Sequence, residues 1–336
     1  MENVTVEMEH KLPRPGVSKL DGLTWPWMVT RETLDAMKVF EVREDDVWVV
    51  TFPKSGTHWA LEMANLILVD GHEHKINRAE VGHPAEFDYS IPGMSASSRR
   101  PQRTLPQYKY IQNWKAPRVV MSHLPEEQIP EQILQGKGKV VYVIRNPKDI
   151  VVSYWHFAVP WTFDKRYEDW ECFFQMFLKG ETIYGSWFDH TLNYWNKHRH
   201  DKNFLFLKYE DMKQDTTKAV IQMADFLDNP LSEESINRVV ELTSVKSMKK
   251  RFDTSVNPKS PKDVPSAGSE ITVDRAPSGP MTPEEIITKY PIGAPKLVRK
   301  GITGDWKSKL TVAQNEALDG LFREKMAGSG LTVRFE

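Results

Sequence analysis

The chain has 336 residues, of which 40% are hydrophobic and 27% are charged, and its 45 basic and 46 acidic side chains leave a net charge of −1. This is the composition of a folded globular protein, and the near-zero charge excludes the strongly basic character typical of nucleic-acid or acidic-membrane binders. A mean hydropathy of −0.52 without any apolar run near ~18 residues argues against a membrane span, and a single cysteine, Cys172, excludes an internal disulfide or a Cys-based zinc site.

The N-terminal residues 1–25 are polar and interrupted by Pro13, Pro15 and Gly16, which predicts an arm over the surface. The start of the chain is acidic and mixed, unlike a secretory signal or an Arg-rich transit peptide. Together with the single cysteine, this predicts a cytoplasmic protein. No convincing linker interrupts residues 26–336, so we predict one domain there.

Short apolar runs alternate with helical stretches through that domain. Runs of this length, rich in β-branched residues and bounded by charge or proline, are typical of strands buried on both faces. The alternation predicts an α/β fold with a mostly parallel central sheet flanked by helices. The predicted strands cover 46–52, 118–121, 140–144 and 203–209, and the predicted helices cover 30–40, 57–69, a stretch capped by Asn146 that starts at Pro147, a stretch ending at 227, and 311–326.

The stretch 252–298 departs from this alternation. It contains eight of the 22 prolines of the chain and shows little periodicity. A long segment of this kind within a compact domain is usually functional or unstructured. We predict a lid that closes over a ligand, with a passive insertion as the alternative.

A first candidate anion site lies where the strand over 46–52 meets the following helix, in the sequence TFPKSGTHW (51–59). A turn at such a junction points several backbone N–H groups and the helix dipole at one spot, and Gly56 allows a ligand to approach closely. Lys54 adds a full charge. The segment predicts a phosphate-binding strand-loop-helix, although it is no Walker A motif because the lysine precedes the glycine. A capped turn with a surface lysine is the alternative.

Two further segments place cations next to turns. In RNPKDIVVS (145–153), Arg145 leaves a predicted strand, which suits bidentate phosphate recognition, while an ion pair with Asp149 explains it equally well. In RKGITGDWK (299–307), two cations precede glycines, which suits a phosphate held by side chains and amides. A solvated charged turn is the alternative for this segment.

These three segments, in this order, resemble the cytosolic sulfotransferase family. The matching motifs are PKSGT-x-W, R-N-P-K-D-x-x-x-S and R-K-G-x-x-G-D-W-K, and similar runs lie at PRVVMSHLP (117–125), YGSW (184–187) and LKYEDMK (207–213). The likeness extends from about Trp25 to the C-terminus. It implies transfer of the sulfonate group from 3′-phosphoadenosine 5′-phosphosulfate to a hydroxyl or amine of a small acceptor such as a phenol, steroid or alcohol, leaving adenosine 3′,5′-bisphosphate, with no metal.

The resemblance also implies a nucleotide site. The loop residues and Trp59 would hold the phosphosulfate and the adenine, and Arg145, Ser153 and the 299–301 segment would hold the 3′-phosphate. Position 58 departs from the family pattern, because relatives often have threonine there. The implied nucleotide-binding residues are Lys54, Ser55, Gly56, Thr57, His58, Trp59, Arg145, Ser153, Tyr209, Thr243, Ser244, Arg299, Lys300 and Gly301.

His123, in PRVVMSHLP, is the predicted catalytic base, since a neutral imidazole can take the acceptor's proton near pH 7. By itself, a histidine at a strand end is more often structural. The resemblance further implies that Lys54 stabilises charge on the leaving nucleotide and that Ser153 restrains Lys54. Met121 stands where many phenol-type relatives have lysine, so Lys54 would carry more of the stabilisation.

Two other functions stay open on the sequence. A kinase or NTPase with a phosphate loop would place similar residues after a strand, but it would need Gly-Lys-Ser/Thr and a strand-end Asp for magnesium. A nucleotide-binding protein without turnover would keep the three anion segments and have no need of His123. Neither the identity of the acceptor nor the effect of Met121 follows from the sequence.

A last motif concerns association. The segment 307–316 resembles the short dimer motif of the family, K-x-x-x-T-V-x-x-x-E, and predicts a homodimer. An ordinary helix start at Thr311 is the alternative. The matching residues are Lys307, Thr311, Val312 and Glu316.

Overall fold

The computed structural model describes residues 16–78, 80, 106–162, 164–255 and 298–336. Its centre is a four-stranded sheet with the order β4–β3–β5–β6, and all three strand pairs are parallel. The strands are β3 (Val47–Thr51), β4 (Val119–Ser122), β5 (Lys139–Ile144) and β6 (Phe204–Lys208). The predicted parallel α/β fold is confirmed.

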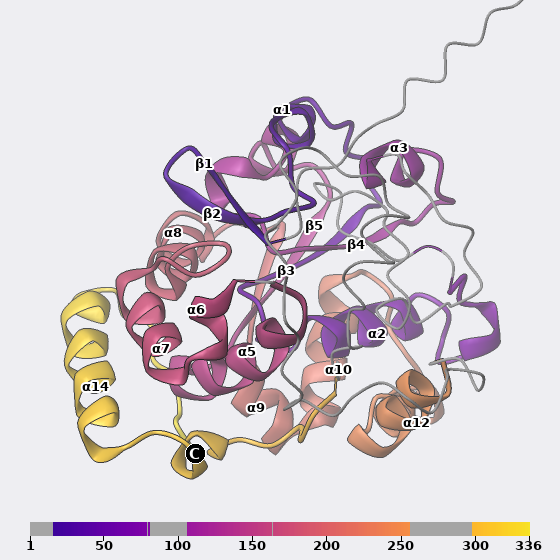
Figure 1. Ribbon diagram of the computed structural model, residues 1–336. Coiled ribbons are helices and arrows are strands. Elements are labelled where there is room, and N and C mark those ends of the chain that lie inside the picture. Colours follow the sequence, from indigo (N-terminus) through magenta and orange to yellow (C-terminus); the bar gives the residue numbers. More distant parts are fainter. Residues whose placement is uncertain (1–15, 79, 81–105, 163, 256–297) are drawn as a thin grey trace, which may run out of the picture.

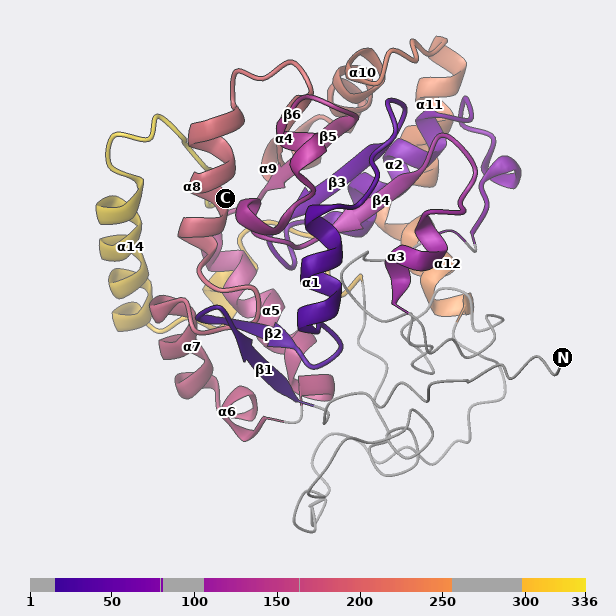
Figure 2. The same ribbon diagram turned by 90° about the horizontal axis from the view of Figure 1, so that it is seen from above.

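The sheet lies between two layers of helices, which Figures 1 and 2 show from two directions. The α-helices are α1 (Arg31–Lys38), α2 (Thr57–Ile67), α3 (Gln107–Ile111), α4 (Glu131–Leu134), α5 (Pro147–Thr162), α6 (Lys165–Glu168), α7 (Trp170–Lys179), α8 (Trp187–His198), α9 (Tyr209–Gln214), α10 (Thr216–Phe226), α11 (Glu233–Leu242), α12 (Val245–Ser255) and α14 (Val312–Met326). Three short 3₁₀ helices, η1 (Glu73–Lys75), η2 (Glu126–Gln128) and η3 (Asp305–Ser308), complete the helical elements of the described residues.

Alternate residues of each strand feed two separate hydrophobic cores. Val47 and Val49 pack with apolar residues of α2, α10 and α11, whereas Trp48 and Val50 pack with residues of α1, α5, α7 and α8. Because both faces are covered, all five residues of β3 are buried, which explains its continuous apolar sequence. The carboxyl ends of the parallel strands meet at one edge, where open α/β sheets bind ligands.

The predicted N-terminal arm over 1–25 is wrong for its last residues. Val17–Leu20 (β1) and Leu23–Pro26 (β2) form an antiparallel hairpin. An isolated parallel β-bridge joins Thr24 of β2 to Ile183. Trp25 is fully buried in the larger core. Burial of this one large side chain outweighs the polar composition around it. Residues 1–15 lie outside the described residues.

The predicted lid over 252–298 falls almost entirely outside the described residues. At its start, the backbone of 252–255 continues helix α12, so the helix extends past the predicted boundary. Within the part of the chain that the structure describes, no helix is long and apolar enough to cross a membrane.

Candidate active site

The loop between β3 and α2 has a backbone that its own residues largely determine. Lys54 and Gly56 have positive φ angles of 70° and 107°, and Gly56 is the N-cap of α2. The Ser55 N–H donates to the Phe52 carbonyl at 3.2 Å, which closes the turn. The first N–H groups of α2 have no partners within the helix, so they are available to an anion.

Glycine is required at position 56 for two reasons. Its φ of 107° is one that side-chain-bearing residues rarely adopt, and a Cβ there would lie 2.8 Å from Cδ2 of Tyr209. Tyr209 itself packs edge-on against Trp59, with ring centroids 5.4 Å apart. The structure thus brings three of the predicted nucleotide-binding residues, Gly56, Trp59 and Tyr209, into direct proximity.

Arg145 connects this loop with residues 299–307, the C-terminal segment. Its Nη1 donates to the Lys54 carbonyl at 3.0 Å, its Nη2 donates to the Ile302 carbonyl at 3.1 Å, and its guanidinium lies 4.4 Å from the ring centroid of Tyr209. Three motifs that lie far apart in the sequence, 51–59, 145–153 and 299–307, therefore meet at one buried arginine. Both terminal nitrogens of the Arg145 guanidinium are therefore bonded to backbone carbonyls.

The C-terminal segment presents two cations that share one carboxylate. Arg299 Nη2 and Lys300 Nζ each lie 2.5 Å from a different oxygen of Asp305. A Cβ at Gly301 would lie 2.8 Å from Cγ2 of Val245, so the segment runs close against the start of α12. Sequence reasoning did not single out Asp305, although its position four residues after Gly301 in the R-K-G-x-x-G-D motif was a usable signal.

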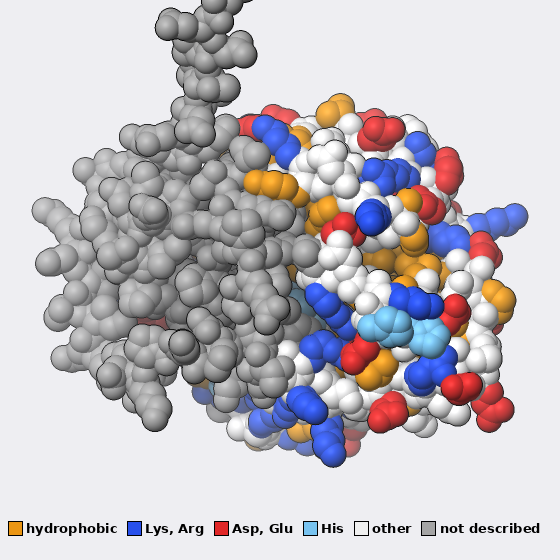
Figure 3. Space-filling model, turned by 90° about the vertical axis from the view of Figure 1, so that its right-hand side faces the viewer, with side chains coloured by type: hydrophobic (Ala, Val, Ile, Leu, Met, Phe, Trp, Pro, Cys, Tyr) orange, Lys and Arg blue, Asp and Glu red, His pale blue; other side chains and the backbone are white. Residues whose placement is uncertain are grey.

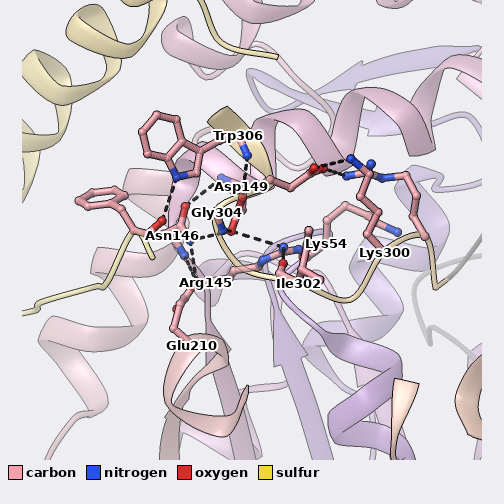
Figure 4. A network of polar contacts seen from close by, with 12 residues as sticks. Lys54, Arg145, Asn146, Asp149, Glu210, Lys300, Ile302, Gly304 and Trp306 are labelled. Carbon is pink, nitrogen blue, oxygen red and sulfur yellow. Dashed lines mark hydrogen bonds and ion pairs between the residues drawn. The ribbon is translucent and has the colours of Figure 1, made fainter. Parts of the chain in front are cut away.

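A network of buried polar groups lies beneath both segments (Figure 4). Asp149 accepts the backbone N–H groups of Gly304 at 2.9 Å and Trp306 at 3.0 Å. Asn146 accepts the N–H of Asp149 at 2.8 Å as the predicted cap of α5, and its own N–H and Nδ2 donate to Glu210 at 3.0 and 2.8 Å. Burial raises the pKa of Glu210 above its usual range. The sequence predicts Asn146 as a helix cap and Asp149 as a candidate ion-pair partner of Arg145, but it does not predict the bonds from Asp149 to the backbone of 304–306.

Among the described residues, the buried polar atoms without a hydrogen-bond partner include Ser55 Oγ, Arg145 Nε and Arg299 Nε of these segments. Buried polar groups are nearly always hydrogen-bonded, and each exception calls for a ligand, a water or strain. All three can donate to an oxygen. The residues therefore fit an anionic ligand with oxygen atoms, such as a phosphate or a sulfonate.

His123 is half-buried just after β4, where its ring is oriented by the end of β3. The Nδ1–H donates to the Thr51 carbonyl at 2.7 Å, and Thr51 Oγ1 lies 3.2 Å from the same nitrogen and 2.7 Å from the Thr57 hydroxyl. With Nδ1 protonated, a neutral His123 carries its lone pair on Nε2. Tyr184, which has a φ of 65°, packs edge-on against this ring at 5.4 Å.

The backbone of His123 is also restrained. His190 Nε2 lies 3.1 Å from the His123 carbonyl, and Tyr142 donates its hydroxyl to His190 Nδ1 at 2.8 Å. Burial lowers the pKa of His190 to about 4, so this ring is neutral and can donate through Nε2 near pH 7. Sequence reasoning passed over His190, which lies on α8 67 residues after His123.

Lys54 has an unusual environment for a lysine. Burial, followed by repulsion from Arg145 and Arg299, lowers its pKa to about 7. Its Nζ lies 4.2 Å from the ring centroid of Phe157 on α5. Three cations thus converge where the predicted loop faces the C-terminal segment, and an anion bound there would relieve their mutual repulsion.

The remaining predicted residues take varied places. Ser153 is buried on α5, about one turn beyond Asp149. The hydroxyls of Thr243 and Ser244 form hydrogen bonds at helix ends. The Thr243 hydroxyl donates to the Val239 carbonyl at 2.8 Å, and the Ser244 hydroxyl accepts from the Ser247 N–H at 3.2 Å. Met121 packs in the apolar core beside α2. The half-buried His58 follows Thr57 in the first turn of α2.

The surface beside this site is rich in cations. Helix α12, which begins next to Gly301, carries Lys246, Lys249, Lys250 and Arg251 among its 11 residues. Figure 3 looks at the side of the molecule with α12 and shows Lys and Arg side chains gathered along its lower edge. Although the whole chain is nearly neutral, this local charge attracts anions.

Comparison with known proteins points to one family. The family described as "Sulfotransferase domain" matches residues 44–275 and 278–330. The chain is similar to Sulfotransferase 1A1 of Bos taurus and Sulfotransferase 2A1 of Homo sapiens, each 34% identical and aligned over 91% of this chain, with 91% and 94% of the relatives covered. The crystal structure of mouse sulfotransferase SULT7A1 complexed with PAP superposes with a TM-score of 0.65 at 28% identity, covering 94% of this chain and 96% of that one.

Proposed function

The chain belongs to the cytosolic sulfotransferase family and is a sulfotransferase that uses 3′-phosphoadenosine 5′-phosphosulfate, and from this premise we propose how its own residues carry out the reaction. In the proposal, His123 is the catalytic base. The carrying observation is the hydrogen bond from its Nδ1–H to the Thr51 carbonyl, which leaves Nε2 as the proton acceptor.

Proton removal by His123 needs a neutral ring and a fixed orientation. The His123 ring donates to the Thr51 carbonyl, and the His123 carbonyl accepts a hydrogen bond from His190 Nε2, so that both side chain and backbone are restrained. When the acceptor hydroxyl or amine attacks, Nε2 takes its proton and the ring becomes an imidazolium. The Thr51 carbonyl then accepts a hydrogen bond from a charged donor, which is stronger than one from a neutral ring.

The nucleotide, when bound, supplies the sulfonate group as an electrophile and the bisphosphate as its leaving group. We assign the phosphosulfate end to the β3–α2 loop, with Ser55, the N–H groups of α2 and protonated Lys54 facing the developing negative charge. The 3′-phosphate is assigned to Arg145, Ser153, Arg299, Lys300 and Gly301. Trp59, Tyr209, Thr243 and Ser244 are assigned to the adenine end, and Thr57 and His58 contribute backbone N–H groups.

We propose that the acceptor is a small molecule with a hydroxyl or an amine. Besides the two relatives above, an amine sulfotransferase of Oryctolagus cuniculus is 32% identical over 89% of this chain. We propose a phenol, steroid, alcohol or amine as acceptor. We also propose a cytoplasmic location and a homodimer through the segment from Lys307 to Glu316.

The decisive test is His123→Ala with His200→Ala as a matched control, since His200 is an exposed histidine outside the site. Loss of a general base lowers turnover by about 10²-fold or more. We expect His123→Ala to lose this much turnover while its Kd for adenosine 3′,5′-bisphosphate stays within about twofold, and His200→Ala to keep both values.

Sulfonate transfer to a panel of phenols, steroids, alcohols and amines from radiolabelled cosubstrate gives the turnover and identifies the acceptor. Calorimetry gives the nucleotide affinity. Near-full turnover by folded His123→Ala would refute the assignment of the base. Binding of the nucleotide without transfer to any member of the panel would instead favour the non-catalytic alternative.

A further inference from the structure

Asp149 has no role in the mechanism proposed above, although it lies next to the residues that do. It is buried on α5, with only 1% of its surface exposed, between the two segments assigned to the 3′-phosphate. We propose that Asp149 is a positioning residue for cosubstrate binding, whose carboxylate docks the backbone of residues 304–306 on α5 and so determines where Arg299 and Lys300 lie. This inference rests on the proposed function, in which those two cations meet the 3′-phosphate.

The contacts of Asp149 use both carboxylate oxygens. Oδ2 accepts the Gly304 N–H at 2.9 Å and Oδ1 accepts the Trp306 N–H at 3.0 Å, while Asn146 Nδ2 lies 3.1 Å from Oδ2. Hydrogen bonds from backbone N–H groups to a carboxylate are charge-assisted and short-ranged. A side chain with only one acceptor oxygen would leave one of these two buried N–H groups unpaired.

The backbone at this point is built for such a partner. Gly304 has a φ of 77° and is the N-cap of η3, which starts at Asp305. N–H groups at a helix start have no partner within the helix, and the turn at Gly304 directs two of them toward α5. The docking therefore satisfies donors that would otherwise be buried and unpaired.

The same carboxylate also connects the two phosphate-facing segments. Arg145 lies between β5 and α5, four residues before Asp149. Its Nη2 is 3.7 Å from Asp149 Oδ2 and donates to the Ile302 carbonyl. Glu210 and Asn146 support the network from the opposite side (Figure 4). A shift of Asp149 would thus be transmitted to both sets of cations.

Asp149 and Asp305 have complementary tasks in this arrangement. Asp305 lies 2.5 Å from the charged ends of both Arg299 and Lys300, so it orients the side chains. Asp149 binds the backbone that carries them. Orientation of the cations relative to Arg145 therefore depends on a residue that itself touches no ligand.

The experiment compares Asp149→Asn with Asp319→Asn by calorimetry. Both changes remove one carboxylate charge near α5, but Asp319 pairs with Lys148 Nζ at 2.7 Å and touches neither N–H group. We expect Asp149→Asn to weaken binding of adenosine 3′,5′-bisphosphate by about 10- to 100-fold and of adenosine 5′-phosphate by less than about threefold. Asp319→Asn is expected to leave the ratio of the two affinities unchanged.

Two further variants separate the possible outcomes. Asp149→Glu keeps two acceptor oxygens, so it should lose less affinity for adenosine 3′,5′-bisphosphate than Asp149→Asn does. If Asp149→Asn does not fold, a smaller loss in Asp149→Glu, again greater for adenosine 3′,5′-bisphosphate than for adenosine 5′-phosphate, supports the proposal. An unchanged affinity ratio in the folded variant overturns the role of Asp149. If wild-type protein and Arg299→Ala show the same ratio, the assignment of the 3′-phosphate to this segment is itself wrong.

Discussion

The two segments to which we assign the phosphates of the nucleotide have their shapes for different reasons. The loop between β3 and α2 is shaped by its own residues, through the positive φ angles of Lys54 and Gly56 and the bond from Ser55 to Phe52. The segment around Arg299 and Lys300 is shaped by partners from elsewhere in the chain. Its main anchors are the Asp149 carboxylate and the Arg145 guanidinium, both on the strand-helix unit at the end of β5.

This difference determines where substitutions act. A change within the β3–α2 loop alters the loop directly, because its backbone is determined mainly by the φ angles of Lys54 and Gly56 and by the bond from Ser55 to Phe52, with one bond from Arg145 to the Lys54 carbonyl added. A change on α5 reaches the C-terminal segment through hydrogen bonds to its backbone. Cation–π contacts add further anchors there, since Lys148 Nζ lies 4.5 Å from the ring centroids of both Trp306 and Phe335, and Lys309 Nζ lies 4.3 Å from that of Trp155.

The largest effect is expected from Gly56→Ala in the locally shaped loop. The substitution places a Cβ 2.8 Å from the Tyr209 ring and forces a side-chain-bearing residue into a φ of 107°, a strain of about 1–3 kcal/mol. We expect nucleotide affinity to fall about 100-fold or more as the N–H groups are displaced. Gly320→Ala, in α14 with nothing within 4 Å of the added Cβ, is the matched control and should bind normally. Equal affinities in calorimetry would show that the loop tolerates the shift.

A smaller but more selective effect is expected from Arg145→Ala, which removes the bridge between the two segments. Binding of adenosine 3′,5′-bisphosphate should weaken by about 10- to 100-fold, and binding of adenosine 5′-phosphate much less. Arg43 is a matched control, since it also donates to two backbone carbonyls, those of Trp114 at 2.8 Å and Gln112 at 2.7 Å, away from the site. Equal losses for both nucleotides would assign Arg145 to structure alone.

The lowered pKa of Lys54 predicts a proton uptake on binding. With a pKa of about 7, Lys54 is mostly neutral at pH 8, and a bound anion favours its charged form. Nucleotide binding at pH 8 should therefore take up a proton, and affinity should fall as pH rises above 7, by at most about tenfold per unit. Calorimetry in two buffers of different ionisation enthalpy measures the uptake. Lys54→Arg, which stays charged, should abolish it; an uptake that persists in this variant would implicate another group.

The smallest effect on catalysis is expected at the far end of the C-terminal segment. Val312 is 76% exposed at the start of α14. The capping bonds between Thr311 and Gln314 explain why the helix starts there, but they give no reason for an exposed apolar side chain at position 312. We expect Val312→Glu to convert a dimer to a monomer in light scattering at micromolar concentration without lowering turnover. Val39→Glu, at an equally exposed valine outside the motif, should change neither. A monomer mass for the wild-type protein would refute the dimer.

Local patterns in the sequence were sufficient for the sheet and for the helices that follow each strand. Strands such as Val47–Thr51 are continuous apolar runs because both faces are covered, and Asn146 with Pro147 marks a helix start by its own chemistry. The hairpin of β1 and β2 escaped prediction because its stability comes from burial of Trp25 in a distant core. Short polar strands have no such local signature.

For the site, the sequence by itself determined the strand-loop-helix turn that we assign to the phosphosulfate and, through the resemblance of its motifs, the family. Its residues are consecutive, and glycine, lysine and hydroxyl side chains produce an anion site from backbone geometry alone. Only the tertiary structure decided which groups orient the others. Asp149, Asp305 and His190 act through hydrogen bonds whose partners lie up to 157 residues away, and no periodicity or spacing records such a contact. These pairings exist because parallel strands bring their carboxyl ends, and the segments that follow them, to one edge of the sheet.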